Sequence, residues 1–204
     1  MSGAGPGRRA LATEYLALKI ARHLGLRVPG AEILDLPRDL PWQAGTDEFY
    51  EAVQRSAGAN LGVAFIPDAY DLKATDLAGL PEVFVNRLAA VDALVQNVDR
   101  TAANPNVMRD VAGAHWAIDF GACLLFDRLA RGANAPSLDL PSNHFLAGKA
   151  GLSDSVREVA ETIDKTLLGT IIEVIPEAWL EDLGLARSAL RQRLTTYLEG
   201  LRAA

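Results

Sequence analysis

Residues that could support catalysis gather in the middle of the chain, in one polar stretch and one tripeptide. Asp99 precedes Asn104 by five residues, and Asp119 stands directly before Phe120-Gly121. A carboxylate can orient a hydroxyl group and accept its proton, and carboxylate and amide oxygens are good ligands for Mg²⁺. Transfer of a phosphoryl group needs these groups together. The pattern therefore indicates a phosphoryl-transfer site.

The spacing of these residues matches a catalytic loop of the protein-kinase type. In such a loop the base aspartate precedes a metal-binding asparagine by five residues, and a second aspartate follows one hairpin later, before Phe-Gly. A structural alternative exists, because Asp99-Arg100 could be an ion pair that ends a helix and Asn104-Pro105-Asn106 a simple turn. The position of Asp119-Phe120-Gly121 after a predicted hairpin favours the catalytic interpretation.

Two elements must position this stretch. A helix over Pro81–Gln96 comes before it, since proline suits the first helical position and apolar residues then recur at helical spacing. Two short strands, Val107–Arg109 and His115–Ile118, come after it and form a hairpin that presents Asp119. The apolar repeat of the helix consists of Phe84, Leu88, Val91 and Val95.

The remaining predicted elements are mostly helical. Upstream, the pattern predicts a helix over Arg9–Leu24, a strand over Ala31–Leu36, a short helix over Thr46–Ser56 and a buried strand over Leu61–Ile66. Residues 68–79 are predicted to be a connection. The downstream helices are predicted at Ser153–Ile175, Pro176–Leu183 and Ala186–Leu201.

The stretch Asp92–Gly121 resembles the HipA-like kinases, a branch of the kinase fold that shares its Asn-x-Asp-Arg loop with type II phosphatidylinositol 4-kinases. Leu11–Pro29 is similar to the family's regulatory-helix region, and Ile175–Leu180 resembles its C-terminal lobe. The resemblance implies an α+β fold, mostly α, with one compact domain overall. Within it, residues 67–204 would form a protein-kinase-like large lobe, and residues 1–66 a truncated small lobe with its hinge.

The resemblance also implies roles for individual residues. Asp99 would be the catalytic base, and Asn104 and Asp119 would bind Mg²⁺ and the nucleotide. The implied cofactors are ATP and Mg²⁺, and the implied reaction is transfer of the γ-phosphoryl group to a hydroxyl acceptor. The residues expected beside the adenine ring are Leu61, Val63 and Phe65, in the hinge strand Leu61–Ile66.

The sequence departs from the kinase pattern in its small lobe. A kinase needs a lysine that holds the α- and β-phosphates and pairs with a helix glutamate, a place that Glu14 could fill. No predicted strand precedes the helix that carries Glu14, and no lysine stands where it is required. Three explanations remain open: the gene starts further upstream, a second chain supplies the missing strands, or the protein is a degenerate kinase. The four lysines are Lys19, Lys73, Lys149 and Lys165.

The sequence therefore supports two hypotheses of different kinds. The first is a HipA-like kinase that transfers phosphate from Mg-ATP to a hydroxyl group of an unidentified protein or small molecule. The second is a catalytically inactive pseudokinase that binds a partner protein through the same fold. The missing lysine favours the second hypothesis, whereas the catalytic spacing favours the first.

Composition narrows the class of protein. The 204 residues, half of them hydrophobic, suit one globular domain. A net charge of -6 and a pI near 5.1 argue against nucleic acid as a partner. No apolar run approaches the roughly 20 residues that span a bilayer, so we expect no membrane partner and a cytoplasmic location. Cys123 is the only cysteine, so no internal disulfide can form, and its apolar neighbours predict a small buried side chain.

Overall fold

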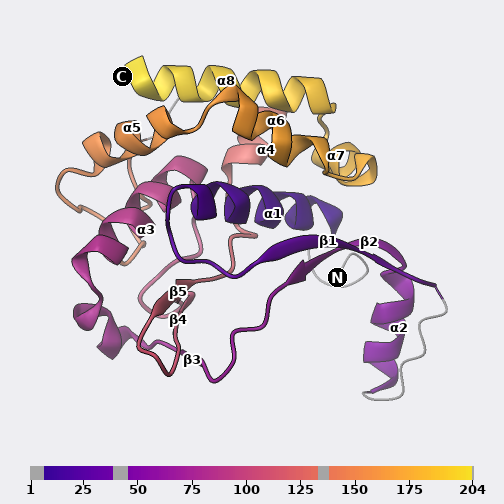
Figure 1. The fold of residues 1–204 in the computed structure, drawn as a ribbon, viewed down its shortest axis with the longest axis horizontal. Coiled ribbons are helices and arrows are strands. Elements are labelled where there is room, and N and C mark those ends of the chain that lie inside the picture. The colour runs from indigo at the N-terminus through magenta and orange to yellow at the C-terminus, as the bar shows by residue number, and fades with distance from the viewer. Residues whose placement is uncertain (1–6, 39–45, 133–137, 204) are drawn as a thin grey trace.

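The computed structural model describes residues 7–38, 46–132 and 138–203, and these form a mostly helical molecule with two small sheets. Helix α1 (Arg8–His23) runs through the middle (Figure 1). The C-terminal helices cover one side of α1, and the sheet of β1 (Ala31–Leu36) and β2 (Gly58–Val63) lies on its other side (Figure 1). This architecture confirms the predicted α+β, mostly α class.

Helix α1 lies within one residue of its predicted bounds at each end. Its C-terminus closes in a Schellman motif, in which Leu26 N–H donates to the carbonyl of Ala21 and Gly25 N–H to that of Arg22. The motif requires a left-handed residue, and Gly25 adopts φ of 73° without the strain that a side chain would cause. The helix is almost completely enclosed; its fully buried residues include Ala12, Leu16, Ala17, Ile20 and Ala21.

The β1–β2 sheet confirms one predicted strand and corrects the other. β1 has its predicted bounds. β2 lies three residues earlier in the chain than the predicted strand Leu61–Ile66, at both its start and its end. The two strands are antiparallel and pair from Leu36↔Gly58 to Ala31↔Val63, so the partner strand sets where β2 lies. The prediction of a buried strand was also wrong, because Phe65 is 87% exposed. Helix α2 (Asp47–Arg55) connects the two strands and confirms the predicted short helix.

The second sheet contains the predicted hairpin. β4 (Val107–Arg109) pairs with β5 (His115–Ala117) as expected. A third strand, β3 (Tyr70–Asp71), joins the outer edge of β4. It lies within residues 68–79, which were predicted to be a connection because the stretch is polar; a strand of two residues leaves no alternating pattern. A 3₁₀ helix, η1 (Ala74–Gly79), fills the rest of that connection.

Helix α3 (Glu82–Val95) leads into the polar stretch and confirms the predicted central helix. The predicted helix Ser153–Ile175 is instead two helices. The side chain of Asp164 accepts the N–H of Leu167 at 2.7 Å and so caps the N-terminus of the second helix. A short helix, α4 (Leu125–Ala130), was not predicted. The remaining helices are α5 (Leu152–Thr162), α6 (Lys165–Glu173), α7 (Glu177–Leu183) and α8 (Arg187–Ala203).

One apolar core extends through both halves of the chain. α1 packs against β1 and β2 and also against α3, α6 and α7, and the buried side chains of these elements form one cluster. The division into a small-lobe segment over 1–66 and a catalytic lobe over 67–204 stays a prediction. Within the described ranges, no helix combines the length and apolar character needed to cross a bilayer.

Candidate active site

The site is built around Asp92, whose carboxylate is completely buried near the end of α3. Its Oδ1 accepts the side-chain N–H of Asn97 at 3.0 Å, and its Oδ2 accepts Nε–H of Arg100 at 2.6 Å. Nε2 of His144 lies 3.0 Å from the same Oδ2. Since Leu146 N–H donates to Nδ1 of His144, Nε2 is the nitrogen that carries the proton toward Asp92. These bonds satisfy a buried charge that would otherwise be costly.

Arg100 is equally buried and connects three parts of the site. Its Nη1 donates to the carbonyls of Pro105, at 3.0 Å, and Asn106, at 2.6 Å. Its Nη2 donates to the carbonyl of Ile118 at 3.3 Å, just after β5, and its guanidinium lies 4.8 Å from the centre of the Phe120 ring. Arg100 therefore pairs with the carboxylate on α3 and not with its neighbour in sequence, so the alternative of a simple helix-ending ion pair with that neighbour is wrong.

Asp99 and Asn104 lie together at the surface of this loop. The backbone N–H of Asp99 donates to Oδ1 of Asn97 at 3.1 Å, which fixes the backbone at that point. Nδ2 of Asn104 donates to Oδ2 of Asp99 at 2.9 Å, and Nδ2 of Asn106 donates to the same oxygen at 3.3 Å. Because the nitrogen of Asn104 faces Asp99, its amide oxygen is the atom that a cation could use.

Asp119 is exposed and follows the end of β5 in a left-handed conformation, with φ of 55°. This conformation is strained for a residue with a side chain and persists only where its surroundings hold it. Ile118 N–H donates to the carbonyl of Asn106 at 2.9 Å, which places the residues before Asp119 against the end of the candidate catalytic loop, residues 97–106. The carboxylate oxygen Oδ1 accepts the N–H of Gly121 at 3.4 Å.

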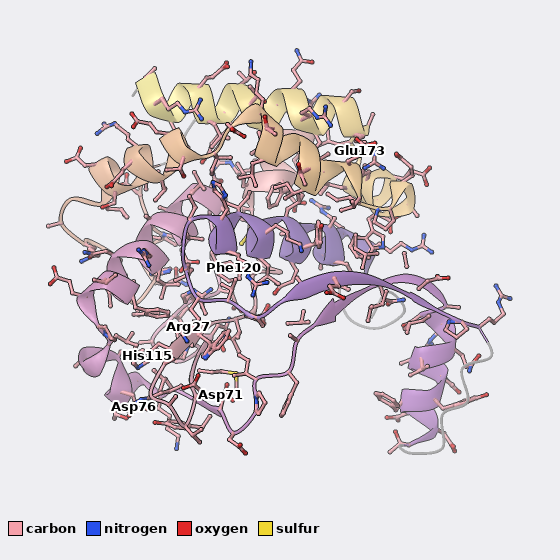
Figure 2. All side chains as sticks on the ribbon, viewed as in Figure 1. Arg27, Asp71, Asp76, His115, Phe120 and Glu173 are labelled. Atoms are coloured by element: carbon pink, nitrogen blue, oxygen red, sulfur yellow. The ribbon has the colours of Figure 1, made fainter. Side chains whose placement is uncertain are left out.

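Glu14 approaches the same segment from α1. Its Oε2 accepts the N–H of Phe120, whose side chain lies beneath α1 (Figure 2). Burial, and then the charge of Asp119, raise the pKa of Glu14 to about 7, although the Phe120 N–H and the charge of Arg100 act in the opposite direction. In the part of the chain that the structure describes, no lysine or arginine forms an ion pair with Glu14. Among the described residues, Glu14 therefore has no cationic partner of the kind that the lysine of a kinase provides.

The hairpin is attached to the chain that follows α1. The carbonyl of Arg27 accepts Ala117 N–H at 2.9 Å, and its guanidinium lies 5.3 Å from the centre of the Trp116 ring. Figure 2 shows the labelled Arg27 near His115 of β5, on the side of α1 where the second sheet lies. The hairpin that leads to Asp119 is thus held on two sides, by Arg27 and by the catalytic loop.

The three residues predicted beside adenine lie at the end of β2 and just beyond it. Leu61 is half-buried, Val63 is 47% exposed and Phe65 is 87% exposed. Val63 lines a cavity of about 290 Å³, together with Leu34 and residues on both strands. The other lining residues are Gly30, Glu32, Gly62 and Ala64.

Metal binding at this site would need more than protein carboxylates. Among the described residues, no group of three His, Cys, Asp or Glu side chains could hold a metal ion. A divalent cation beside Asp119 would therefore rely on the amide oxygen of Asn104 and on oxygens of its own ligand. Cys123 takes no part, since burial raises the pKa of its thiol well above the usual value. Its position confirms the predicted small buried side chain.

Sequence reasoning missed His144 and Arg27. His144 is 52 residues from Asp92 in sequence and belongs to no motif, so only the folded chain brings the two side chains together. Arg27 contributes its backbone carbonyl, and backbone contacts of this kind leave no signature in the residue type. Asn97 and Asp92 hold the loop by hydrogen bonds.

Comparison with known proteins agrees with this arrangement. A family model described as HipA-like kinase matches residues 1–202. The chain belongs to the HipA-like kinases. Among solved structures, it is similar to the crystal structure of a Helicobacter pylori proinflammatory kinase, CtkA, with a TM-score of 0.53 and 16% sequence identity. That match covers 96% of this chain and 80% of CtkA, and at this identity it shows the fold alone. No curated protein matches the chain.

Membership of the HipA-like kinases confirms the family that the stretch Asp92–Gly121 predicted. The similarity to CtkA confirms a kinase-like α+β fold for this HipA-like kinase. The comparisons do not reach the roles of Asp99, Asn104, Asp119 and Glu14, which stay predictions.

Proposed function

We propose that this HipA-like kinase transfers the γ-phosphoryl group of ATP to a hydroxyl acceptor, with Mg²⁺ as its metal. The observation that carries the proposal is the set of bonds made by Arg100. One buried guanidinium joins α3, the catalytic loop and the end of β5. Asp99, Asn104 and Asp119, the side chains that phosphoryl transfer requires, thus extend from a single fixed frame.

Asp99 is proposed to orient the acceptor hydroxyl and take its proton. Its Oδ2 accepts two amide N–H groups, from Asn104 and Asn106, and no described residue donates to its Oδ1. Oδ1 is therefore the oxygen that would receive the proton. As the acceptor oxygen bonds to the γ-phosphorus, the bond from that phosphorus to the β-phosphate oxygen breaks, and ADP is the leaving group.

Asn104 and Asp119 are proposed to hold Mg²⁺. Both side chains are exposed, and both present an oxygen of the hard type that this ion prefers. Two protein ligands suffice, because phosphate oxygens and water complete the coordination in sites of this kind. Bound there, Mg²⁺ would neutralise the charge of the phosphates. The left-handed backbone at Asp119 sets the direction in which its carboxylate leaves the chain.

The adenine ring is proposed to lie beside the end of β2. Val63 lines the cavity of about 290 Å³ there, which supports its place in the nucleotide site. Leu61 and Phe65 are not among the lining residues of that cavity. The proposed hinge therefore rests on Val63, and a purine would cover part of the exposed apolar surface that Val63 and Phe65 present.

The test is thermal stability with and without Mg-ATP. At about 100 times its dissociation constant, a ligand stabilises a protein by roughly 2.7 kcal/mol, which corresponds to a Tm increase of roughly 5 to 10 °C for a chain of this size. We expect that increase for the unmodified protein and its loss in Asp119→Ala. Asp182→Ala, which removes an exposed carboxylate from α7, should keep the increase. A full increase in Asp119→Ala would show that the metal assignment is wrong.

A second function is favoured by the contact of Glu14. Its carboxylate accepts a backbone N–H of Phe120 where a kinase would have a lysine. This supports the alternative of a pseudokinase that binds a partner protein, or of a kinase completed by a lysine from a second chain. Nucleotide binding without release of ADP over hours would favour the pseudokinase, whereas transfer of labelled phosphate would favour the enzyme.

A further inference from the structure

Helix α1 contacts the segment after Asp119 at two points. Glu14 Oε2 accepts the N–H of Phe120, the residue directly after Asp119. Five residues earlier on the helix, Arg9 forms a two-point ion pair with Asp127, in which Nε donates to Oδ1 and Nη2 lies against Oδ2. Asp127 belongs to α4, the helix that follows the segment. The two contacts therefore attach α1 to both ends of the segment Phe120–Asp127.

A cavity of about 380 Å³ lies between α1 and this segment. Because it separates the first turns of α1 from the chain opposite, apolar packing is reduced there. The two side chains that form the ion pair both line the cavity, so the pair spans it. Arg9 and Thr13 line it on the side of α1, and Gly121, Leu124 and Asp127 line it opposite.

The ion pair is better suited to fixing geometry than to stabilising the fold. Its side chains are 39% and 27% exposed, and ion pairs this exposed contribute little to stability. An arginine–carboxylate pair with two parallel contacts nevertheless fixes direction as well as distance, because the guanidinium is planar. The pair between Arg9 and Asp127 therefore links the start of α1 to α4 in a defined orientation.

The position of α1 matters for Asp119 because the backbone there is strained. Asp119 has φ of 55°, and the next N–H is bonded to Glu14. A shift of α1 would move that N–H and the peptide plane between Asp119 and Phe120. The direction of the Asp119 carboxylate would change with it.

We propose that Arg9 and Asp127 are positioning residues for the metal-binding segment, and that they act through Glu14. Neither residue touches the catalytic loop side chains Asp99 and Asn104. The effect on nucleotide binding rests on the proposed function, whereas the effect on the backbone at Phe120 does not.

The first measurement is hydrogen exchange of the Phe120 amide, followed by NMR in the nucleotide-free protein. We expect exchange to be roughly two- to fivefold faster in Arg9→Ala and in Asp127→Ala. This range corresponds to the free energy that a partly exposed ion pair contributes. The reversed pair, Arg9→Asp with Asp127→Arg, should restore the original rate. Arg191→Ala removes a comparable exposed pair with Glu173 between α8 and α6, and should leave the Phe120 rate unchanged.

The second measurement separates positioning from general loosening. We expect Arg9→Ala to weaken binding of Mg-ATP by roughly two- to fivefold and to leave binding of ATP in EDTA unchanged, because only the first depends on Asp119. Arg9→Lys keeps the charge but loses the planar guanidinium that makes two parallel contacts. Its affinity for Mg-ATP should therefore lie between those of the unmodified protein and Arg9→Ala. This milder variant also keeps the test decisive if an alanine variant does not fold.

The outcomes distinguish the two proposals. An unchanged Phe120 rate in both alanine variants, or the same increase in Arg191→Ala, would overturn the positioning role. Equal losses of affinity with and without Mg²⁺ would overturn it as well. If the unmodified protein binds no Mg-ATP, the proposed function fails, and the exchange rates still decide whether Arg9 and Asp127 position the segment.

Discussion

At the scale of single residues, the charged side chains of the site differ in their exposure to solvent. Asp92 and Arg100 are fully buried and satisfy each other, whereas Asp99 and Asp119 reach the surface, where a substrate could meet them. Glu14 is intermediate: it is largely removed from water, and its main partner is a neutral N–H of Phe120. Its titration is therefore the residue-scale property that the structure predicts most directly.

We expect Glu14→Gln to stabilise the metal-free protein at alkaline pH. The folded-state pKa of Glu14 is raised from 4.5 to about 7, so its proton helps folding below pH 4.5, and that help is lost as pH rises to 7. Glutamine cannot ionise, and its oxygen can still accept the Phe120 N–H. The free energy of unfolding of the variant should exceed that of the unmodified protein by about 1 to 3 kcal/mol at pH 8.

The measurement is urea denaturation of both proteins in EDTA at pH 4.5, 6 and 8. All other titrating groups are common to the two proteins, so their difference isolates Glu14. A difference that stays constant over this range would show that the carboxyl titrates at its ordinary value in the folded state.

At the scale of elements, helix ends decide how the catalytic parts are spaced. α3 ends at Gln96 with a left-handed residue, so the catalytic loop turns away from the helix axis directly after it. The boundary between α5 and α6 depends on the side chain of Asp164, which caps the second helix. The apolar pattern continues through this boundary, which explains why one long helix was predicted there.

We expect Asp164→Ala to lower the free energy of unfolding by about 1 kcal/mol, because the N–H of Leu167 then loses its acceptor. Asp164→Asn keeps an acceptor oxygen and should cost much less. Urea denaturation followed by circular dichroism measures both variants. The cap is remote from the catalytic loop in sequence, so a loss of Mg-ATP binding in Asp164→Ala would contradict this local role.

At the scale of the whole molecule, α1 belongs to the apolar core that both parts of the chain share. It lies between the β1–β2 sheet and the C-terminal helices (Figure 1). Trp179 of α7 is fully buried and donates its indole N–H to the carbonyl of Ala59 in β2 at 3.3 Å, so the first and last parts of the chain are in direct contact. Such packing favours cooperative unfolding of the whole chain.

We expect Leu16→Ala to destabilise the entire molecule by about 2 to 5 kcal/mol, because Leu16 is fully buried on α1 and its removal leaves a cavity in the shared core. Tryptophan fluorescence and far-ultraviolet circular dichroism should report one coincident transition, before and after the substitution. Two separate transitions would show that residues 1–66 and 67–204 unfold independently, and would support the predicted division at residue 66.

Sequence alone determined the family, the fold class and the spacing of the candidate catalytic residues. Asp99, Asn104 and Asp119 are separated by a short loop and a hairpin, and contacts this local are encoded by turn residues and by apolar repeats such as that of α3. Periodic patterns also predicted α1 within one residue at each end, since its apolar positions recur at helical spacing, and prolines after it bounded the strand β1.

Only the tertiary structure decided which distant groups complete the site. His144 reaches Asp92, Glu14 reaches Phe120 and Arg9 reaches Asp127 across separations of 52, 106 and 118 residues. The start of β2 was likewise set by its partner strand, because strand register depends on the pairing and not on the strand's own residues. Contacts of this kind are made by the packing of whole elements, and no pattern within a single segment can specify them.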